Sequence, residues 1–122
     1  MPILEIEVVG ELAPGKRDGL AGRLAEETGR VLGSRPQGTW VRLRELARED
    51  YAENGGGPPE GVLPVFVRVL MAEVPAGEAL ARLARDLTTA VAEACGRAPE
   101  DVHVLFEPPA HGRIAFGGQL RS

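Results

Sequence analysis

The sequence predicts an α+β protein built from two tandem β-α-β units, which form a four-stranded mixed sheet with both helices on one face. Two observations predict this fold. The succession of a strand pattern, a helix pattern and a second strand pattern occurs twice within 122 residues. Each half also ends in a glycine pair, at Gly55-Gly56 and at Gly117-Gly118. Because β-α-β crossovers share one hand, two such units place their helices on the same side of the sheet.

Each half opens and closes on a segment with the alternating or β-branched character of a strand. The opening strands are PILEIEVV, from Pro2, and PVFVRVL, from Pro64. The closing strands are TWVRLRE, from Thr39, and DVHVLFE, from Asp101. A β-α-β connection makes the two strands of each unit parallel.

The segments between the strands have the 3.6-residue apolar period of amphipathic helices. Pro14 and Pro75 are each expected to open a helix, since proline is tolerated in a first turn. Apolar stripes then follow, formed by Leu20, Leu24 and Val31 in the first helix and by Leu80, Leu83, Leu87 and Val91 in the second. The helices are predicted to end at GSRP and GRAP, where glycine caps the helix and proline prevents its continuation.

These elements predict a single domain over residues 1–122, made of repeats 2–56 and 64–118. The Gly/Pro-rich stretch 53–61 is the linker between them. With both helices on one face, the other sheet face lacks cover, and residues such as Phe66 and Leu70 need a partner there. We therefore expect an apolar free face and an oligomer whose subunits pack with their sheets inward.

The composition excludes several classes of function. The 14 basic and 18 acidic side chains give a net charge of −4 with interspersed signs, so we expect neither a nucleic acid nor a membrane as partner. No apolar run reaches the roughly 18 residues of a membrane span. The segment MPILEIEVV also lacks the basic flank of a signal peptide, so we expect a cytoplasmic protein.

The potential metal-binding and redox residues are few. Cys95 is the single cysteine, which excludes an internal disulfide and indicates a buried structural thiol. His103 and His111 lack the spacing of metal ligands, so we expect no metal site.

The combination of Pro2 after the initiator methionine, two β-α-β units and Gly-Gly endings resembles the tautomerase superfamily in its fused two-copy form. The ending RIAFGGQL, from Arg113 to Leu120, is similar to the C-terminal hairpin of the 4-oxalocrotonate tautomerase group, and the whole architecture to the macrophage migration inhibitory factor group. This resemblance implies a homotrimer and a cofactor-independent enzyme. Its substrate would be a small 2-hydroxy or 2-keto carboxylate.

The resemblance also implies that Pro2 is catalytic once Met1 is removed. Its secondary amine would then act as general base or general acid. An ordinary α-amine has a pKa near 8, and an apolar pocket lowers the pKa because it disfavours the cation. A base with a pKa near neutrality suits proton abstraction beside a carbonyl. The sequence leaves both protonation states open.

Four further residues are implied as substrate-binding groups. Strand alternation places Trp40, Arg42 and Arg44 on one face, and Arg42 matches the family's second-strand arginine. Tyr51 falls near the family's hairpin aromatic residue, and His103 is the counterpart of Arg42 in the second repeat. Arginine binds a carboxylate through paired hydrogen bonds. The alternative for Arg42 and Arg44 is a role in salt bridges at an interface or in solvent. The alternative for His103 is a structural role in its strand.

One departure from the family pattern concerns the arginine expected after the first strand, since Leu12 and Val74 fall at those positions. This departure weakens assignment to a dicarboxylate substrate. A second reading within the fold is a dehalogenase, hydratase or decarboxylase that uses the same proline on a short unsaturated or β-keto acid. A third is a non-catalytic oligomeric module that binds ligands, since fold alone does not determine function.

Overall fold

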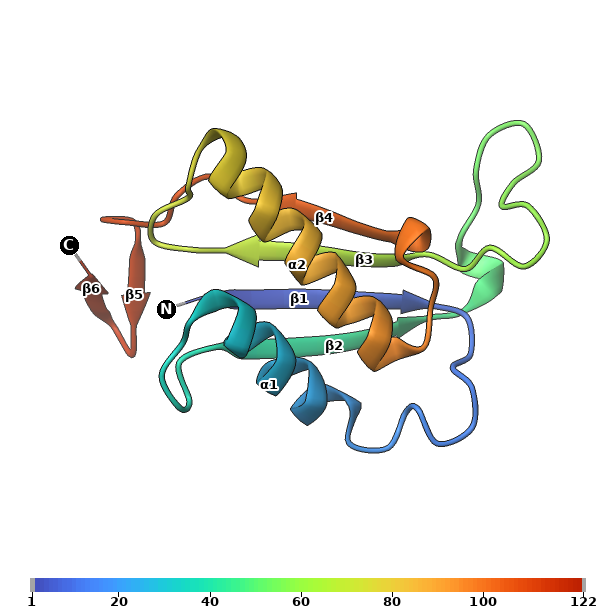
Figure 1. Ribbon diagram of the computed structural model, residues 1–122, viewed down its shortest axis with the longest axis horizontal. Coiled ribbons are helices and arrows are strands. Elements are labelled where there is room, and N and C mark those ends of the chain that lie inside the picture. The colour runs from blue at the N-terminus through green and yellow to red at the C-terminus, as the bar shows by residue number, and fades with distance from the viewer. Residues whose placement is uncertain (1, 122) are drawn as a thin grey trace.

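The computed structural model describes residues 2–121 and confirms the predicted α+β fold (Figure 1). The first unit comprises β1 (Ile3–Val9), α1 (Leu20–Leu32) and β2 (Trp40–Leu46). The second unit comprises β3 (Val65–Leu70), α2 (Gly77–Cys95) and β4 (Val102–Phe106). Single 3-10 turns, η1 (Arg48–Asp50) and η2 (Pro99–Asp101), adjoin β2 and β4. The hairpin of β5 (Ile114–Phe116) and β6 (Gln119–Arg121) follows.

The main sheet has the strand order β2-β1-β3-β4. Within each unit the two strands are parallel, and the units join through the antiparallel pair β1 and β3. Both helices lie across the same face of this sheet (Figure 1). The C-terminal hairpin forms its own two-stranded sheet beyond the end of the main one where β1 begins (Figure 1).

The helices end where the sequence predicts, but they begin later. Gly33 and Gly96 cap α1 and α2 in the left-handed conformation. The expectation that Pro14 and Pro75 open the helices is wrong, because α1 begins at Leu20 and α2 begins at Gly77. After Pro14, Gly15 and Gly19 have φ values of 83° and 66°, and this left-handed backbone cannot belong to a right-handed helix. Both prolines therefore lie in the preceding loops.

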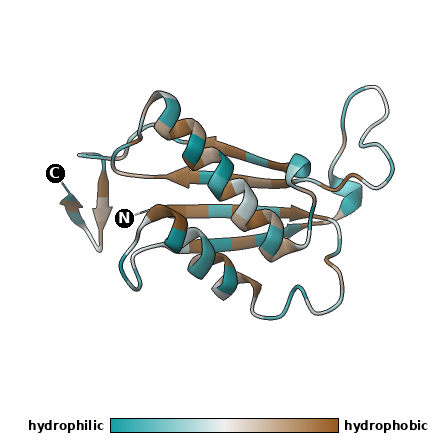
Figure 2. Ribbon diagram, viewed as in Figure 1, coloured by the Kyte–Doolittle hydropathy of each residue, from teal (hydrophilic) through white to brown (hydrophobic). Residues whose placement is uncertain are grey.

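The core forms between the helices and the inward residues of the strands. Alternate residues of the two central strands are fully buried, namely Leu4, Ile6, Val8, Val65, Val67 and Val69. They form one cluster with Leu20, Leu24, Leu87 and Val91 of the helices. Val41 and Leu43 of β2 pack against this cluster as the alternation predicts. Figure 2 shows hydrophilic and hydrophobic segments following one another along the strands.

The free face of the sheet differs from the apolar surface expected from the sequence. The outward positions of the four strands are largely charged or polar: Glu5, Glu7, Arg42, Arg44, Arg68 and His103. The apolar residue Phe66 is half-buried, since the rings of Tyr51 and His103 flank it. The prediction of an apolar free face is therefore wrong, because charged and polar side chains occupy most of the outward positions.

Neither helix within residues 2–121 has an apolar stretch long enough to cross a lipid bilayer.

Candidate active site

Pro2 lies at the start of the sheet, immediately before β1, and is buried. Its carbonyl oxygen accepts a hydrogen bond from the backbone N–H of Trp40 at 3.0 Å, which fixes Pro2 against the first residue of β2. Met1 is outside the described residues, so its removal remains a prediction. The structure thus holds Pro2 by backbone pairing at a defined position, at the beginning of the central strand β1.

An aromatic pair connects the start of β2, beside Pro2, with the C-terminal hairpin. The ring of Trp40 is 46% exposed and meets the ring of Phe116 edge to face, with 5.5 Å between centroids. The indole Nε1 donates a hydrogen bond to the carbonyl oxygen of Gln37 at 3.0 Å. Sequence reasoning missed this aromatic pair because β2 and β5 are far apart in the chain. The only signal for it was the hairpin resemblance that contains Phe116.

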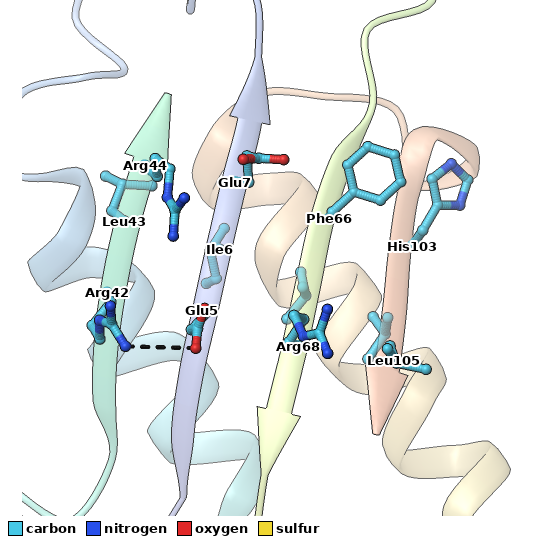
Figure 3. Close-up of a pocket in the computed structure, with 12 residues that line it drawn as sticks. Glu5, Ile6, Glu7, Arg42, Leu43, Arg44, Phe66, Arg68, His103 and Leu105 are labelled. Carbon is cyan, nitrogen blue, oxygen red and sulfur yellow. Dashed lines mark ion pairs between the residues drawn. The ribbon is translucent and has the colours of Figure 1, made fainter. Parts of the chain in front are cut away.

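A concave surface of about 640 Å³ lies on the free face of the sheet (Figure 3). Strand register arranges its outward side chains in two rows that cross all four strands. The first row is Arg42, Glu5, Arg68 and Leu105. The second row is Arg44, Glu7, Phe66 and His103. The first row is nearer to Pro2 because β1 runs from Ile3 through Glu5 to Glu7.

The arginines of the first row are both paired with carboxylates. Arg42 Nη1 lies 3.5 Å from Glu5 Oε2 (Figure 3), and Arg68 Nη2 lies 2.6 Å from Glu107 Oε1. The side chain of Arg42 is nevertheless 69% exposed. Exposed ion pairs contribute only about 0–1 kcal/mol, and a guanidinium has five donors, so Arg42 can still bind an incoming carboxylate.

The second row contains an aromatic group. The ring of Phe66 lies 5.6 Å from the imidazole of His103 and 5.9 Å from the ring of Tyr51. The Tyr51 hydroxyl donates a hydrogen bond to Glu53 Oε2 at 2.7 Å. This hydrogen bond raises the pKa of Tyr51, since loss of the phenolic proton would leave two anions in contact. Tyr51 is therefore a neutral hydroxyl whose proton is already engaged.

Within one chain, the predicted substrate-binding residues lie in two separate places. Arg42 shares the outward side of β2 with Trp40, two residues from the strand's contact with Pro2. Tyr51 and His103 lie instead around Phe66, and Arg44 belongs to the same second row. This row crosses β1 at Glu7, about 17 Å along the strand from Pro2 at roughly 3.4 Å per residue. A small substrate at Pro2 cannot touch both places within one chain.

Cys95 is buried in the core cluster, as expected for a structural thiol. Desolvation by this burial raises the pKa of Cys95 more than the nearby cations of Arg97, Arg23 and Lys16 lower it. The neutral thiol therefore takes no part in the candidate site.

The comparison with sequence families gives one match. Residues 66–121 match the family model described as tautomerase enzyme. This segment contains nearly all of the second β-α-β unit and the C-terminal hairpin. No curated protein sequence matches the chain.

Solved structures match over almost the whole chain. A fused 4-OT described as a symmetric trimer is 20% identical, with coverage of 98% of this chain and 94% of its own, at a TM-score of 0.77. A malonate semialdehyde decarboxylase inhibited by 3-bromopropiolate is 19% identical, with coverages of 94% and 88%, at 0.71. A macrophage migration inhibitory factor-like protein from Entamoeba histolytica is 12% identical, with coverages of 98% and 97%, at 0.67. At these identities the likeness establishes a shared fold.

Proposed function

Because this chain has the tautomerase superfamily fold over its whole length and matches the tautomerase family in residues 66–121, we propose that it is a cofactor-independent tautomerase. Its substrate is a small 2-hydroxy or 2-keto carboxylate, and Pro2 is the general base and acid after Met1 is removed. The observation that carries the proposal is the position of Pro2. It is buried, and its backbone is hydrogen-bonded to β2, the strand that bears Arg42.

The chemistry needs one proton carrier beside the reacting carbon. The neutral amine of Pro2 takes a proton from the carbon next to the keto group, and the C–H electron pair becomes the enolate double bond. The ammonium of Pro2 then returns this proton to the enolate oxygen, which completes the enol and restores the neutral amine. The reverse sequence converts the enol to the ketone. Burial around Pro2 favours the neutral amine, the form that accepts a proton.

Arg42 binds the substrate carboxylate in this proposal. It lies on the same strand face as Trp40, and its guanidinium is exposed despite the contact with Glu5. A bound carboxylate can replace the Glu5 contact at little cost, because that ion pair is open to solvent. A single arginine suits a monocarboxylate, in agreement with Leu12 and Val74 at the positions where the family has another arginine.

A decarboxylase is the second candidate, since a malonate semialdehyde decarboxylase shares the fold over 94% of this chain. In that reaction the cationic amine of Pro2 would donate a proton to the carbonyl oxygen of a β-keto acid, and the bond to the carboxylate carbon would break. The protonation state of Pro2 therefore separates the two functions.

Hydrogen exchange tests the proposed function directly. Protein whose intact mass shows Pro2 as the first residue is incubated with phenylpyruvate or 2-oxobutanoate in D₂O, and deuterium at the carbon beside the keto group is followed by NMR. We expect exchange well above the buffer rate. Exchange at the buffer rate with every 2-keto acid would refute the tautomerase, and release of CO₂ from malonate semialdehyde would favour the decarboxylase.

We also propose that the protein is a homotrimer with its charged sheet faces inward, as the fused 4-OT structure is described as a trimer. The C-terminal hairpin extends past the main sheet (Figure 1), and Leu120 in it is 65% exposed. Light scattering should give three times the chain mass of 13.0 kDa. Leu120→Glu should weaken the assembly, whereas Ala81→Glu, at an exposed position of α2 on the helix side of the sheet, serves as the comparison. A wild-type monomer at micromolar concentration would contradict the trimer.

A further inference from the structure

The second row of the free sheet face has the properties of a ligand site separate from Pro2. We propose that Arg44, Glu7 and Phe66, with Tyr51 and His103 beside the ring, bind an aromatic α-amino acid. Figure 3 shows all of these side chains except Tyr51. The proposal concerns a different place on the sheet from the proposed tautomerase site. It therefore stands or falls independently of that activity.

The charged side chains of this row, Glu7 and Arg44, have opposite signs and lie on neighbouring strands. Glu7 and Arg44 are register partners on β1 and β2, yet neither makes an ion pair or a side-chain hydrogen bond within residues 2–121. The equivalent pair in the first row, Glu5 and Arg42, is in contact at 3.5 Å. Figure 3 accordingly marks an ion pair in the first row and none in the second. A carboxylate and a guanidinium left free in one groove can bind an ammonium and a carboxylate.

The aromatic end of the row is equally specific. Phe66 is half-buried, with the rings of Tyr51 and His103 on either side at 5.9 and 5.6 Å. The hydroxyl of Tyr51 is bound by Glu53, so the Tyr51 ring is held in place. Three rings at these separations form a surface on which a planar ring can pack in an offset or edge-to-face arrangement. An aliphatic side chain would gain only the burial of its apolar area.

The order of the three groups matches one class of ligand. Arg44, Glu7 and Phe66 come from the neighbouring strands β2, β1 and β3, which are roughly 4.8 Å apart. An aromatic amino acid carries its carboxylate and its ammonium on one carbon and its ring one methylene further on. Its two charges can therefore meet Arg44 and Glu7 while its ring reaches Phe66 on the next strand. The groove of about 640 Å³ is ample for it, and small-molecule pockets usually measure about 300–1,000 Å³.

The neighbouring row does not compete for this ligand. Arg42 is open to a carboxylate, but the first row has Arg68 and Leu105 on β3 and β4, where the second row has Phe66 and His103. The first row therefore offers no ring surface to an aromatic ligand. In the proposed trimer this face of each sheet points inward, and each chain contributes one such site. We therefore expect a stoichiometry of one ligand per chain.

Calorimetric titration of the intact assembly with L-phenylalanine tests the proposal. We expect saturable binding at one per chain. Three analogues each lack one recognised group: 3-phenylpropionate lacks the ammonium, phenethylamine lacks the carboxylate, and L-leucine lacks the ring. Each should bind at least about tenfold more weakly, because a charged hydrogen bond or a ring contact is lost. L-leucine binding as tightly as L-phenylalanine would overturn the assignment of the ligand class.

Variants locate the site. Glu7→Gln, Arg44→Gln and Phe66→Leu should each weaken L-phenylalanine binding about tenfold or more. Glu93→Gln and Arg85→Gln, at exposed positions of α2, provide matched controls that should leave it unchanged. Circular dichroism verifies that all five variants are folded. Pro2→Ala should retain full binding, which distinguishes this site from the catalytic one. Absence of saturable heat at millimolar ligand, or equal binding by the three groove variants, would overturn the proposal.

Discussion

Replacing Pro2 with alanine is expected to lower kcat by about 10²- to 10⁴-fold, the usual contribution of a positioned acid or base. Alanine supplies a primary amine of different basicity on a more flexible chain end. The proton transfer itself should therefore be slowed, whereas the proposed substrate contact at Arg42 should remain. Steady-state kinetics with the substrate identified by deuterium exchange measures the effect. Both proteins need intact masses that show the first residue to be Pro2 or its alanine replacement.

Arg42→Ala provides the comparison for this result. In the proposed site its guanidinium binds the substrate carboxylate in the ground state as well as in the transition state, so much of the loss should appear as a higher KM. The size should be roughly ten- to a hundredfold for one charge-assisted contact. The wild-type profile of kcat/KM against pH should show an ionisation below about 8, the ordinary pKa of an α-amine. A Pro2→Ala protein with full kcat and an unchanged profile would make the amine a bystander and favour a ligand-binding module.

The fold was predictable because its signals are local and occur twice. Alternation in the strands, the helical period and the glycine caps at Gly33 and Gly96 each depend on a few neighbouring residues. The helix starts were not predictable from Pro14 and Pro75, since proline is compatible with a first turn and equally with a loop. The left-handed backbone of Gly15 and Gly19 delays the start of α1 to Leu20. Glycine adopts either sign of φ, so the sequence alone does not reveal this conformation.

The candidate site was predictable only in part. Alternation correctly assigned Arg42 and Arg44 to the free face, but it cannot tell which residues of other strands lie opposite them. Register is a long-range property, and it places Glu5 against Arg42 and Glu7 against Arg44. Phe66 was noted as an apolar residue that needs cover, and its flanking rings come from Tyr51 and His103. The unpaired charges and the aromatic group became visible only with that register.

Truncation of the core residue Leu87 to alanine should destabilise the protein by about 2–5 kcal/mol, the usual cost of such a substitution in a packed core. Leu87 is fully buried and belongs to the cluster that joins α2 to the central strands, which include Val67 and Val69. The lost methyl groups leave a cavity between the helix and the sheet, and this packing holds the second unit against the first. Urea unfolding at one fixed protein concentration measures the change, since an assembly makes stability depend on concentration.

Leu105→Ala is the matched control, because the same side chain is 54% exposed on the free face. Its removal should change the unfolding free energy by no more than about 0.5 kcal/mol, as for other surface substitutions. If Leu105→Ala costs as much as Leu87→Ala, the free face is buried in the assembly as deeply as the core. A small cost for Leu87→Ala would instead show that α2 contributes little to the packing. The difference between the two leucines therefore tests the location of the core and the openness of the charged face together.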